Sequence, residues 1–302
     1  MSKCMKRFGL FVGASCVAGV VGAVWGWRET RRFELKEVTV PLLEPGVLRG
    51  RECFKILHIS DVHMVPGQVA KQEWVRSLAS VDPDLVVNTG DNLSDLKGVP
   101  GVLRALEPLL RRPGLFVFGS NDYFAPRMVN PFVYVLGKKR KVSDVALPWS
   151  DMRAAFMEHG WLDATHARHE FKVGSVRVAA AGVDDPHHDL DDYSLIAGAP
   201  NPDADLSLAL VHAPEPRVLE LFDADNYQLS LSGHTHGGQF CLPGSYALVT
   251  NCGIDRARVQ GLHRFGNMFM HVSNGLGGSK FVPFRFFCRP SATVIRVVEK
   301  SA

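Results

Sequence analysis

The stretch Phe54-Lys-Ile-Leu-His-Ile-Ser60 is an apolar, β-rich run, and Asp61-Val62-His63 follows it directly. Runs of this length and composition are typical of buried strands. The same arrangement, an apolar run that ends in a polar motif, occurs four more times. These motifs are Gly90-Asp91-Asn92, Gly119-Ser120-Asn121-Asp122, Val211-His212 and Gly233-His234-Thr235-His236-Gly237-Gly238-Gln239. The sequence therefore predicts a set of strands that present polar side chains at their carboxyl ends.

Helix and strand signals alternate after the first run. We expect helices at residues 69–79 and 102–110, and strands at residues 84–88 and 115–118. A β-α-β-α-β order implies a parallel sheet with covering helices, whose ligand crevice lies beyond the carboxyl ends of the strands. Asp61, Asp91 and Asn121 fall at that edge. The second half is richer in strands, with a hairpin around Gly174-Ser175, further strands at residues 206–211, 228–231, 268–273 and 293–298, and a helix at 216–223.

The polar motifs supply carboxylate, amide and imidazole groups and no thiolate. This mixture suits hard or borderline divalent metals such as Mn, Fe, Zn or Mg. There are too many ligands for one closed tetrahedral site, but they suit two metals that share a carboxylate. The predicted metal ligands are Asp61, His63, Asp91, Asn121, His212, His234 and His236.

The order of the five motifs resembles that of the calcineurin-like metallophosphoesterases, over residues 54–298. The stretches Gly233 to Gln239, Asn274 to Gly277 and Phe284 to Pro290 resemble one branch of small, membrane-associated bacterial phosphoesterases, some of which are UDP-diacylglucosamine pyrophosphatases. The resemblance implies an α/β fold of two packed mixed sheets flanked by helices, in one catalytic domain at residues 53–302. It also implies two divalent metal ions (Mn, Fe or Zn) as cofactors.

The resemblance implies a role for each ligand as well. Asp61, His63 and His236 would bind one metal, Asn121, His212 and His234 the second, and Asp91 would bridge the two. A water shared by both metals would lose its proton near neutral pH and attack phosphorus in line. Asp91 and His236 are thus the residues closest to the catalytic chemistry.

The chain departs from the family after its third strand. The usual motif is Gly-Asn-His-Asp or Gly-Asn-His-Glu, in which Asn binds metal and His protonates the leaving group, whereas Ser120 and Asn121 stand at these positions here. Either Ser120 is a poor ligand, or the loop shifts by one residue so that Asn121 reaches the metal, which we favour because a hydroxyl binds divalent metals weakly. Without the usual acid, a pyrophosphate or activated phosphodiester is a better substrate than an alkyl phosphomonoester.

Two further polar residues are candidates for substrate binding. Asn92 either orients substrate or caps a turn, and Asp122 either replaces the missing acid or orients its loop. The cluster Asp184-Asp185-Pro186-His187-His188 is read as a polar loop that caps the site, in preference to a third metal site.

The N-terminus carries a charge-free apolar run from Phe8 to Trp27, long enough to span a bilayer as a helix. Basic residues follow at once, as after a retained anchor, and a poorly defined cleavage site argues against a signal peptide. We expect a membrane anchor with basic flanks at residues 1–32 and a linker at 33–52. The basic residues after the span, Arg28, Arg31 and Arg32, favour a catalytic domain on the cytoplasmic side.

The segment from Ala125 to Trp149 carries three prolines, an apolar patch and the basic run Lys138 to Lys141. It is either a solvated loop or a cap that touches the membrane surface or a lipid. The 302 residues carry a net charge of only +3, and this balance indicates no nucleic-acid partner.

Together these features predict a membrane-anchored, two-metal phosphoesterase acting on a phosphodiester or pyrophosphate, with a phosphorylated small molecule or a lipid- or nucleotide-linked compound as substrate. The alternatives are a broad phosphomonoesterase, or a metal-binding sensor or scaffold that has lost catalysis. The sequence does not fix the native metal, the substrate or the oligomeric state.

Overall fold

The computed structural model describes residues 19–127, 144–278 and 280–301. Residues 19–29 are helical and precede the first strand. The strands are β1 Glu34–Leu43, β2 Phe54–Ile59, β3 Leu85–Asn88, β4 Gly114–Phe116, β5 Leu162–Asp163, β6 Ala167–Val173, β7 Val176–Gly182, β8 Leu206–Leu210, β9 Leu229–Ser232, β10 Cys241–Leu242, β11 Tyr246–Ala247, β12 Gly261–Phe265, β13 Met268–Val272 and β14 Ser291–Glu299. The α-helices are α2 Val69–Ser77, α3 Val99–Leu106, α4 Ser120–Tyr123, α6 Trp149–Glu158 and α7 Pro216–Ala224, and short 3-10 helices lie at Leu78–Val81, Pro186–His188, Tyr193–Leu195, His236–Gly238 and Arg256–Arg258.

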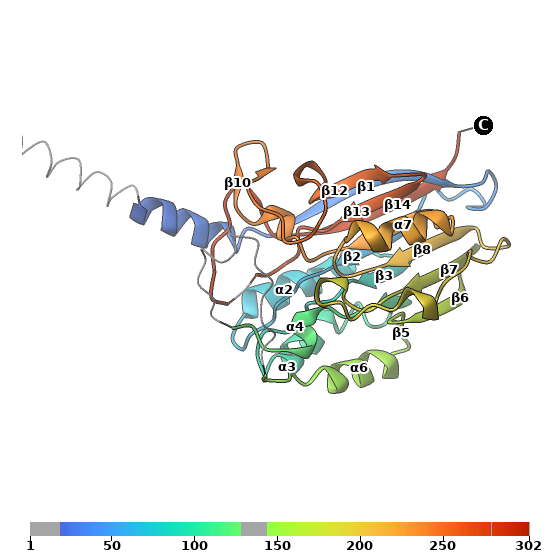
Figure 1. Ribbon diagram of the computed structural model, residues 1–302. Coiled ribbons are helices and arrows are strands. Elements are labelled where there is room, and N and C mark those ends of the chain that lie inside the picture. The colour runs from blue at the N-terminus through green and yellow to red at the C-terminus, as the bar shows by residue number, and fades with distance from the viewer. Residues whose placement is uncertain (1–18, 128–143, 279, 302) are drawn as a thin grey trace, which may run out of the picture.

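Two six-stranded mixed sheets form the centre of the molecule (Figure 1). The first has the order β1-β14-β2-β3-β4-β5, in which β2 to β5 are parallel neighbours and β14 runs antiparallel to β2. The second has the order β12-β13-β9-β8-β7-β6, with β13, β9, β8 and β7 parallel and the two edge strands antiparallel. The predicted α/β fold of two packed mixed sheets flanked by helices is confirmed.

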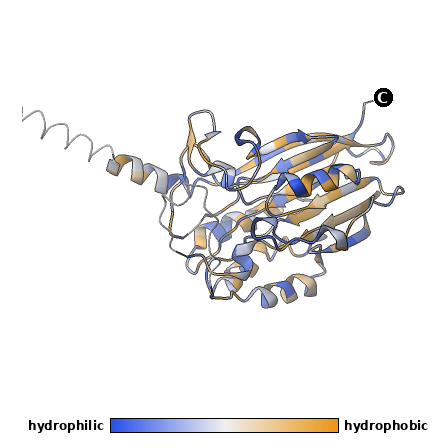
Figure 2. Cartoon of the chain, in the orientation of Figure 1, coloured by the Kyte–Doolittle hydropathy of each residue, from blue (hydrophilic) through white to orange (hydrophobic). Residues whose placement is uncertain are grey.

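Apolar residues form three layers around these sheets. One cluster lies between the sheets and takes side chains from strands of both, including Ile56, Val87 and Leu208. A second lies under α2, α3 and α6, and a third between the second sheet and α7. Strands covered on both faces read as largely apolar runs, as β3 and β8 do. Figure 2 shows hydrophobic stretches in both sheets, interrupted by hydrophilic residues on several strands. The result is a four-layer sandwich of helix, sheet, sheet and helix.

The segment 33–52, expected to be a linker, instead carries the ten-residue strand β1. β1 pairs in parallel with β14 from Glu34 opposite Ser291 onward, and its inner residues Val40, Leu42 and Leu43 join the cluster between the sheets. The linker expectation was wrong because the outer half of this strand is an exposed, charged sheet edge. Its pairing partner lies at the opposite end of the chain.

The N-terminal span predicted from Phe8 to Trp27 lies mostly outside the described residues. Among the residues that the structure does describe, no helix is long and apolar enough to cross a membrane. The helix at residues 19–29 leads away from the sandwich at one end (Figure 1). Most of the segment from Ala125 to Trp149, with its basic run Lys138 to Lys141, also lies outside the described residues, and its last residue begins α6.

A truncation in β1 tests whether this strand is part of the core. Leu43 is fully buried, so Leu43→Ala should lower the free energy of unfolding by about 2–5 kcal/mol, the usual cost of emptying a core leucine site. Leu35, on the same strand, is 45% exposed, and Leu35→Ala should change it by less than about 0.5 kcal/mol. Chemical denaturation of both variants measures the difference; equal, small effects would show that β1 does not contribute to the core.

Candidate metal centre

The predicted ligands lie just beyond the carboxyl ends of five neighbouring strands, where parallel strands of a sheet present their ligand crevice. The ends of β2, β3 and β4 bring in the first sheet's residues, and those of β8 and β9 bring in the second sheet's. In chain order the residues that follow these strands are Asp61 and His63, Asp91, Asn121, His212, and His234 and His236. The centre therefore sits where the edges of the two sheets meet.

The backbone of this centre is unusual. Five of the predicted ligands have a positive φ, between 46° and 68°: Asp61, His63, Asp91, His234 and His236. Such left-handed residues other than glycine are uncommon and concentrate at functional sites. Hydrogen bonds between loops hold this geometry, since the Asp61 N–H donates to the Gly90 carbonyl at 2.8 Å and the His63 N–H to the Asp91 carbonyl at 2.9 Å. The loops after β2 and β3 thus fix each other.

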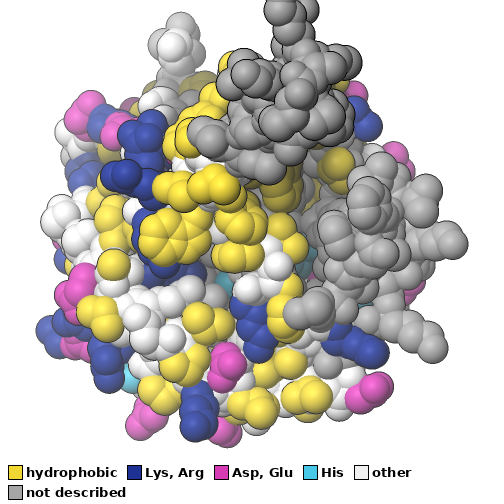
Figure 3. Space-filling model, turned by 90° about the vertical axis from the view of Figure 1, so that its left-hand side faces the viewer, with side chains coloured by type: hydrophobic (Ala, Val, Ile, Leu, Met, Phe, Trp, Pro, Cys, Tyr) yellow, Lys and Arg dark blue, Asp and Glu magenta, His cyan; other side chains and the backbone are white. Residues whose placement is uncertain are grey.

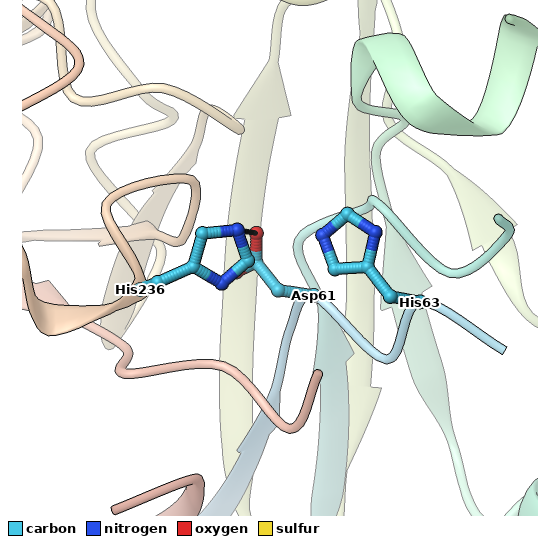
Figure 4. Close-up of side chains that lie close together, drawn as sticks. All are labelled: Asp61, His63 and His236. Atoms are coloured by element: carbon cyan, nitrogen blue, oxygen red, sulfur yellow. Dashed lines mark ion pairs between the residues drawn. The ribbon is translucent and has the colours of Figure 1, made fainter. Parts of the chain in front are cut away.

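Two groups of buried side chains converge closely enough to hold metal ions. Ligand atoms of Asp61, His63 and His236 lie within 4.8 Å of one another, and so do those of Asp61, Asp91 and His212. Figure 4 shows the first group, in which Asp61 and His63 come from the loop after β2 and His236 from the loop after β9. Asp61 belongs to both groups, so they are adjacent.

The imidazole nitrogens show that these groups fit a metal. His63 Nδ1 lies 2.9 Å from Ser94 Oγ, and His212 Nδ1 donates to the Thr89 carbonyl at 2.6 Å. Within the described part of the chain, Nε2 of His63, His212 and His234 is buried without a hydrogen-bond partner. A second hydrogen bond at Nδ1 is what orients a metal-binding imidazole and leaves Nε2 free. Buried polar atoms are otherwise almost always satisfied, so these nitrogens fit a divalent ion.

Asp91 lies at the centre of this arrangement. Its Oδ2 atom is 3.5 Å from His63 Nε2 and 3.4 Å from His212 Nε2. A carboxylate facing unprotonated nitrogens is stable only with a positive charge between them, either a proton or a metal ion. Without a metal, burial alone would lower the pKa of His212, but the carboxylates of Asp91, Asp185 and Asp61 together raise it well above its usual range. Burial by itself would raise the pKa of Asp91, but His212, His63 and Asn121 hold the pKa of that carboxyl well below its usual range.

The other imidazoles are neutral at physiological pH. Burial lowers the pKa of His63 to about 4 and that of His234 to about 3, and it lowers the pKa of His236 well below its usual range. Neutral imidazole is the form that binds metals. Burial has the opposite effect on a carboxyl group and raises the pKa of Asp61 to about 6.

The loop after β4 turns Asn121 toward the centre. The Asn121 backbone N–H donates to Asp91 Oδ1 at 2.8 Å and its side-chain amide to Asp91 Oδ2 at 2.7 Å. Ser120 instead donates its N–H to Asp185 Oδ2 at 2.9 Å. This geometry favours the loop shift over Ser120 as the residue at the metal, and Asn121 as a ligand stays a prediction.

Asn92 and Asp122 make contacts that hold loops. Both Asp122 oxygens are fully buried and accept backbone N–H groups from Asp91, Asn92, Leu93 and Gly119 at 2.7–3.2 Å. The Asn92 amide pairs with the Asn88 amide at 2.8 and 3.1 Å. Their substrate-binding role stays a prediction, but the contacts seen here are those of positioning residues.

Arg285 also lies at this centre, although the sequence analysis assigns it no role. It is 2% exposed, and its guanidinium donates to the carbonyls of Asn274, Gly275 and Gly277 and lies 3.4 Å from His236 Nδ1. The signal in the sequence is an arginine inside the aromatic stretch Phe284 to Phe287. A charged residue within such a stretch indicates a buried hydrogen-bonding role, because an unpaired buried cation is too costly.

The loop from Asp184 to His188 closes one side of the centre. Asp185 is fully buried and accepts the Ser120 N–H, and the ring of His187 lies 4.3 Å from that of His234. This placement agrees with a polar loop that caps the site.

Two buried Asp–His groups at the carboxyl ends of two packed mixed sheets define a metal-dependent phosphoester hydrolase. The chain belongs to the calcineurin-like phosphoesterase family, whose model matches residues 54–238, more than half of the chain. Members of this family are metal-dependent phosphoester hydrolases that use two divalent metals, and the groups around Asp61 and Asp91 could hold them.

Curated relatives extend the similarity beyond the matched region. The uncharacterized metallophosphoesterase YkoQ of Bacillus subtilis is 28% identical over 86% of this chain and 89% of its own length. A transmembrane protein with metallophosphoesterase domain from Bos taurus is 28% identical over 67% of this chain and 44% of its own length. The phosphodiesterase YaeI of Escherichia coli is 33% identical over 30% of this chain and 32% of its own length.

The pH dependence of metal binding tests the centre. Asp61 has a folded pKa of about 6, raised above that of an unfolded carboxyl, so its ionisation destabilises the metal-free fold as pH rises toward and through 6. A bound cation removes this cost because it stabilises the ionised carboxylate. Below about pH 6 a proton competes with the cation for Asp61 and weakens metal binding by up to about tenfold per pH unit. Mn²⁺ should therefore raise the melting temperature of the chelator-treated protein more at about pH 7.5 than at about pH 5.5. Equal shifts at both pH values in thermal denaturation would contradict this assignment.

Proposed function

We propose that this protein is a membrane-anchored phosphodiesterase or pyrophosphatase whose substrate is a lipid- or nucleotide-linked phosphate. The observation that carries the reaction class is the shared carboxylate of Asp91, which faces His63 and His212 and is itself oriented by Asn121. Its negative charge sits where two cations would otherwise repel each other. The name of the relative YaeI, a phosphodiesterase, supports the same class.

The chain's own residues divide the work at this centre. Asp61 and Asp91 would hold the positive charge of the metals, and the neutral rings of His63, His234 and His236 would set the geometry without adding charge. His212, whose pKa the nearby carboxylates raise in the metal-free protein, would give up its proton when it binds. When bound, two divalent metals lower the pKa of a water molecule and stabilise charge on the phosphoryl oxygens. Asp122 keeps the loop of Asp91 in place by accepting three backbone N–H groups of that loop.

The preference for a good leaving group follows from the absence of the family's usual general acid at this centre. In the sequence, aligned without a gap, Asn121 stands where the family has its proton-donating His, and an amide has no acidic proton to give. Burial raises the pKa of Asp122 to about 7, but this side chain is fully buried and both of its oxygens accept backbone N–H groups of Asp91 and Asn92, so it is not placed to protonate a leaving group. General acid catalysis matters most for basic alkoxide leaving groups, so groups that leave without a proton are favoured. An acid anhydride or an activated diester meets this requirement.

A kinetic comparison tests the reaction class. Full-length protein in neutral detergent should hydrolyse bis(p-nitrophenyl) phosphate only after Mn²⁺ is restored, with a higher kcat/KM than for p-nitrophenyl phosphate. Asp91→Ala should lower kcat/KM at least about 100-fold, since loss of an oriented metal ligand costs at least as much as loss of the groups that support it. Asp203→Ala, at an exposed aspartate outside the centre, is the matched control and should retain full activity.

Two results would redirect the proposal. A faster monoester reaction would identify a broad phosphomonoesterase. Metal binding without turnover of either compound would identify a sensor or scaffold.

Several features support the anchor. The described helix at residues 19–29 leaves Val20, Val21 and Val24 64%, 62% and 51% exposed, and it continues the charge-free run that begins at Phe8. Its base is fixed to the domain, since the ring of Trp25 lies 4.7 Å from that of Phe287 and the Arg285 N–H donates to the Gly26 carbonyl. The name of the bovine relative, a transmembrane protein, agrees with this arrangement. The basic residues after the span, Arg28, Arg31 and Arg32, favour the cytoplasmic side for the domain.

Fractionation of cells tests the anchor and its direction. The full-length protein should stay in the membrane pellet after alkaline carbonate extraction, while a variant that lacks residues 1–24 should move to the supernatant. Added protease should degrade the domain only after the cytoplasmic membrane is opened. Extraction of the full-length chain would contradict the anchor, and degradation in intact spheroplasts would contradict the cytoplasmic side.

A further inference from the structure

A cavity of about 260 Å³ lies beside the metal centre, and none of the predicted metal ligands lines it. Its walls come from residues 27–33 at the foot of the N-terminal helix, residues 67–71 at the start of α2, Gln239, and residues between 276 and 285 of the loop that precedes β14. The side chains that matter for its chemistry are Trp27, Arg31, Lys71, Lys280, Phe284 and Arg285.

One layer of residues separates this cavity from the metal centre. Lys71 donates from Nζ to the carbonyl of Val62 at 2.6 Å, and Val62 stands between Asp61 and His63. On the opposite wall, Arg285 contacts the carbonyl of Gly277 and lies 3.4 Å from His236 Nδ1. Occupancy of the cavity therefore bears on the loops that carry His63 and His236.

The cavity is positively charged. Four cations line it, and among the described residues of the lining there is no aspartate or glutamate. Arg285 is neutralised in part by the backbone carbonyls it contacts, and Lys280 lies 3.6 Å from Asp95. Lys71 is only 7% exposed, its Nζ donates to one neutral carbonyl, and burial lowers its pKa to about 7. An anion in the cavity would stabilise the ammonium form of Lys71, because an isolated buried charge is costly.

The remaining wall is apolar, and the foot of the N-terminal helix forms part of it. Phe33, Val69, Val282 and Phe284 contribute hydrocarbon surface, and Trp27 carries the guanidinium of Arg31 stacked 3.6 Å from its ring centroid. On the face from which the N-terminal helix leaves the domain, hydrophobic side chains gather beside Lys and Arg (Figure 3). Tryptophan and basic residues next to an apolar surface are typical of a membrane interface.

We propose that this cavity binds one anionic phospholipid of the surrounding membrane, with its headgroup phosphate against Lys71 and Arg31 and an acyl chain along the wall formed by Val282 and Phe284. Anionic headgroups complement the cations, and the chain lies where the foot of the anchor meets the bilayer surface. The lipid is a partner that seats the metal centre at the membrane, distinct from the substrate that is hydrolysed. The inference rests on the proposed anchor and is independent of which phosphoester the centre hydrolyses.

Calorimetric titration of metal-free, full-length protein in neutral detergent with dihexanoyl phosphatidylglycerol tests the site, because chelation prevents binding at the metal centre. Ala70→Trp places a bulky side chain in the cavity from an exposed position on α2, and it should abolish binding. Glu73→Trp, one turn further along α2 and outside the lining, should bind as the wild type does. Arg31→Gln should weaken binding about tenfold, the loss expected for one charge-assisted hydrogen bond, and the exposed Arg258→Gln should not.

Two comparison ligands identify what is recognised. Glycerol 3-phosphate carries the anion without the chains, and dihexanoyl phosphatidylcholine carries the chains without net charge, so both should bind at least about tenfold more weakly. Equal affinity for either compound, or unchanged binding in Ala70→Trp, would overturn the proposal. If lipid bound only to the anchor, Ala70→Trp would not change the measured affinity. The lipid affinity is measured without metal, so it does not depend on whether Asp91→Ala loses phosphodiesterase activity.

Discussion

Around the Asp91 carboxylate, two imidazole nitrogens lie at 3.4 and 3.5 Å and the Asn121 amide donates at 2.7 Å, all in a buried space. In so little solvent, the repulsion between a carboxylate and nitrogen lone pairs, or between two cations placed there, is only weakly screened. Asp91 therefore has to attract positive charge and also reduce the repulsion between two positive charges. The surrounding contacts hold the Asp91 carboxylate in the position that this balance of charges requires. They include the four backbone N–H groups that donate to Asp122, three of which belong to the loop of Asp91.

This balance requires the loops to be held in conformations that they would not adopt alone. Five predicted ligands have left-handed backbone angles, and conformations of this kind persist only when the surroundings enforce them. The enforcement comes from the sandwich, because the cluster between the sheets fixes the ends of β2, β3, β8 and β9 relative to one another. Small residues complete it: a side chain at Gly233 would collide with Ser60 and Asp61, so the loops after β9 and β2 can meet only if this position is glycine.

The sequence predicts those parts of the molecule in which local pattern and tertiary role coincide. β3 and β8 are buried on both faces and read as apolar runs, and the motifs of the predicted ligands stand directly after such runs, so fold class and candidate ligands both follow. β1 was missed for the opposite reason, because half of it is an exposed, charged edge. What makes it a strand is its parallel pairing with β14 at the other end of the chain, from Glu34 opposite Ser291 to Leu43 opposite Glu299. The environment of Arg285 also depends on contacts across the fold. No periodicity in its own segment indicates that carbonyls from Asn274 to Gly277 would surround it.

Those distant contacts connect the N-terminal helix to the chemistry. Trp25 packs on Phe286 and Phe287, the Gly26 carbonyl accepts the Arg285 N–H, and Glu29 lies 3.8 Å from Arg289. The side chain of Arg285 in turn reaches His236, which is one of the predicted metal ligands. Two or three contacts thus separate the segment nearest the proposed membrane from the metal centre. Arg285 is buried, its backbone N–H bonds to the base of the helix, and its side chain reaches the loop that carries His236, so one tightly packed residue contacts both. The base of the N-terminal helix and the metal centre therefore belong to one packed unit.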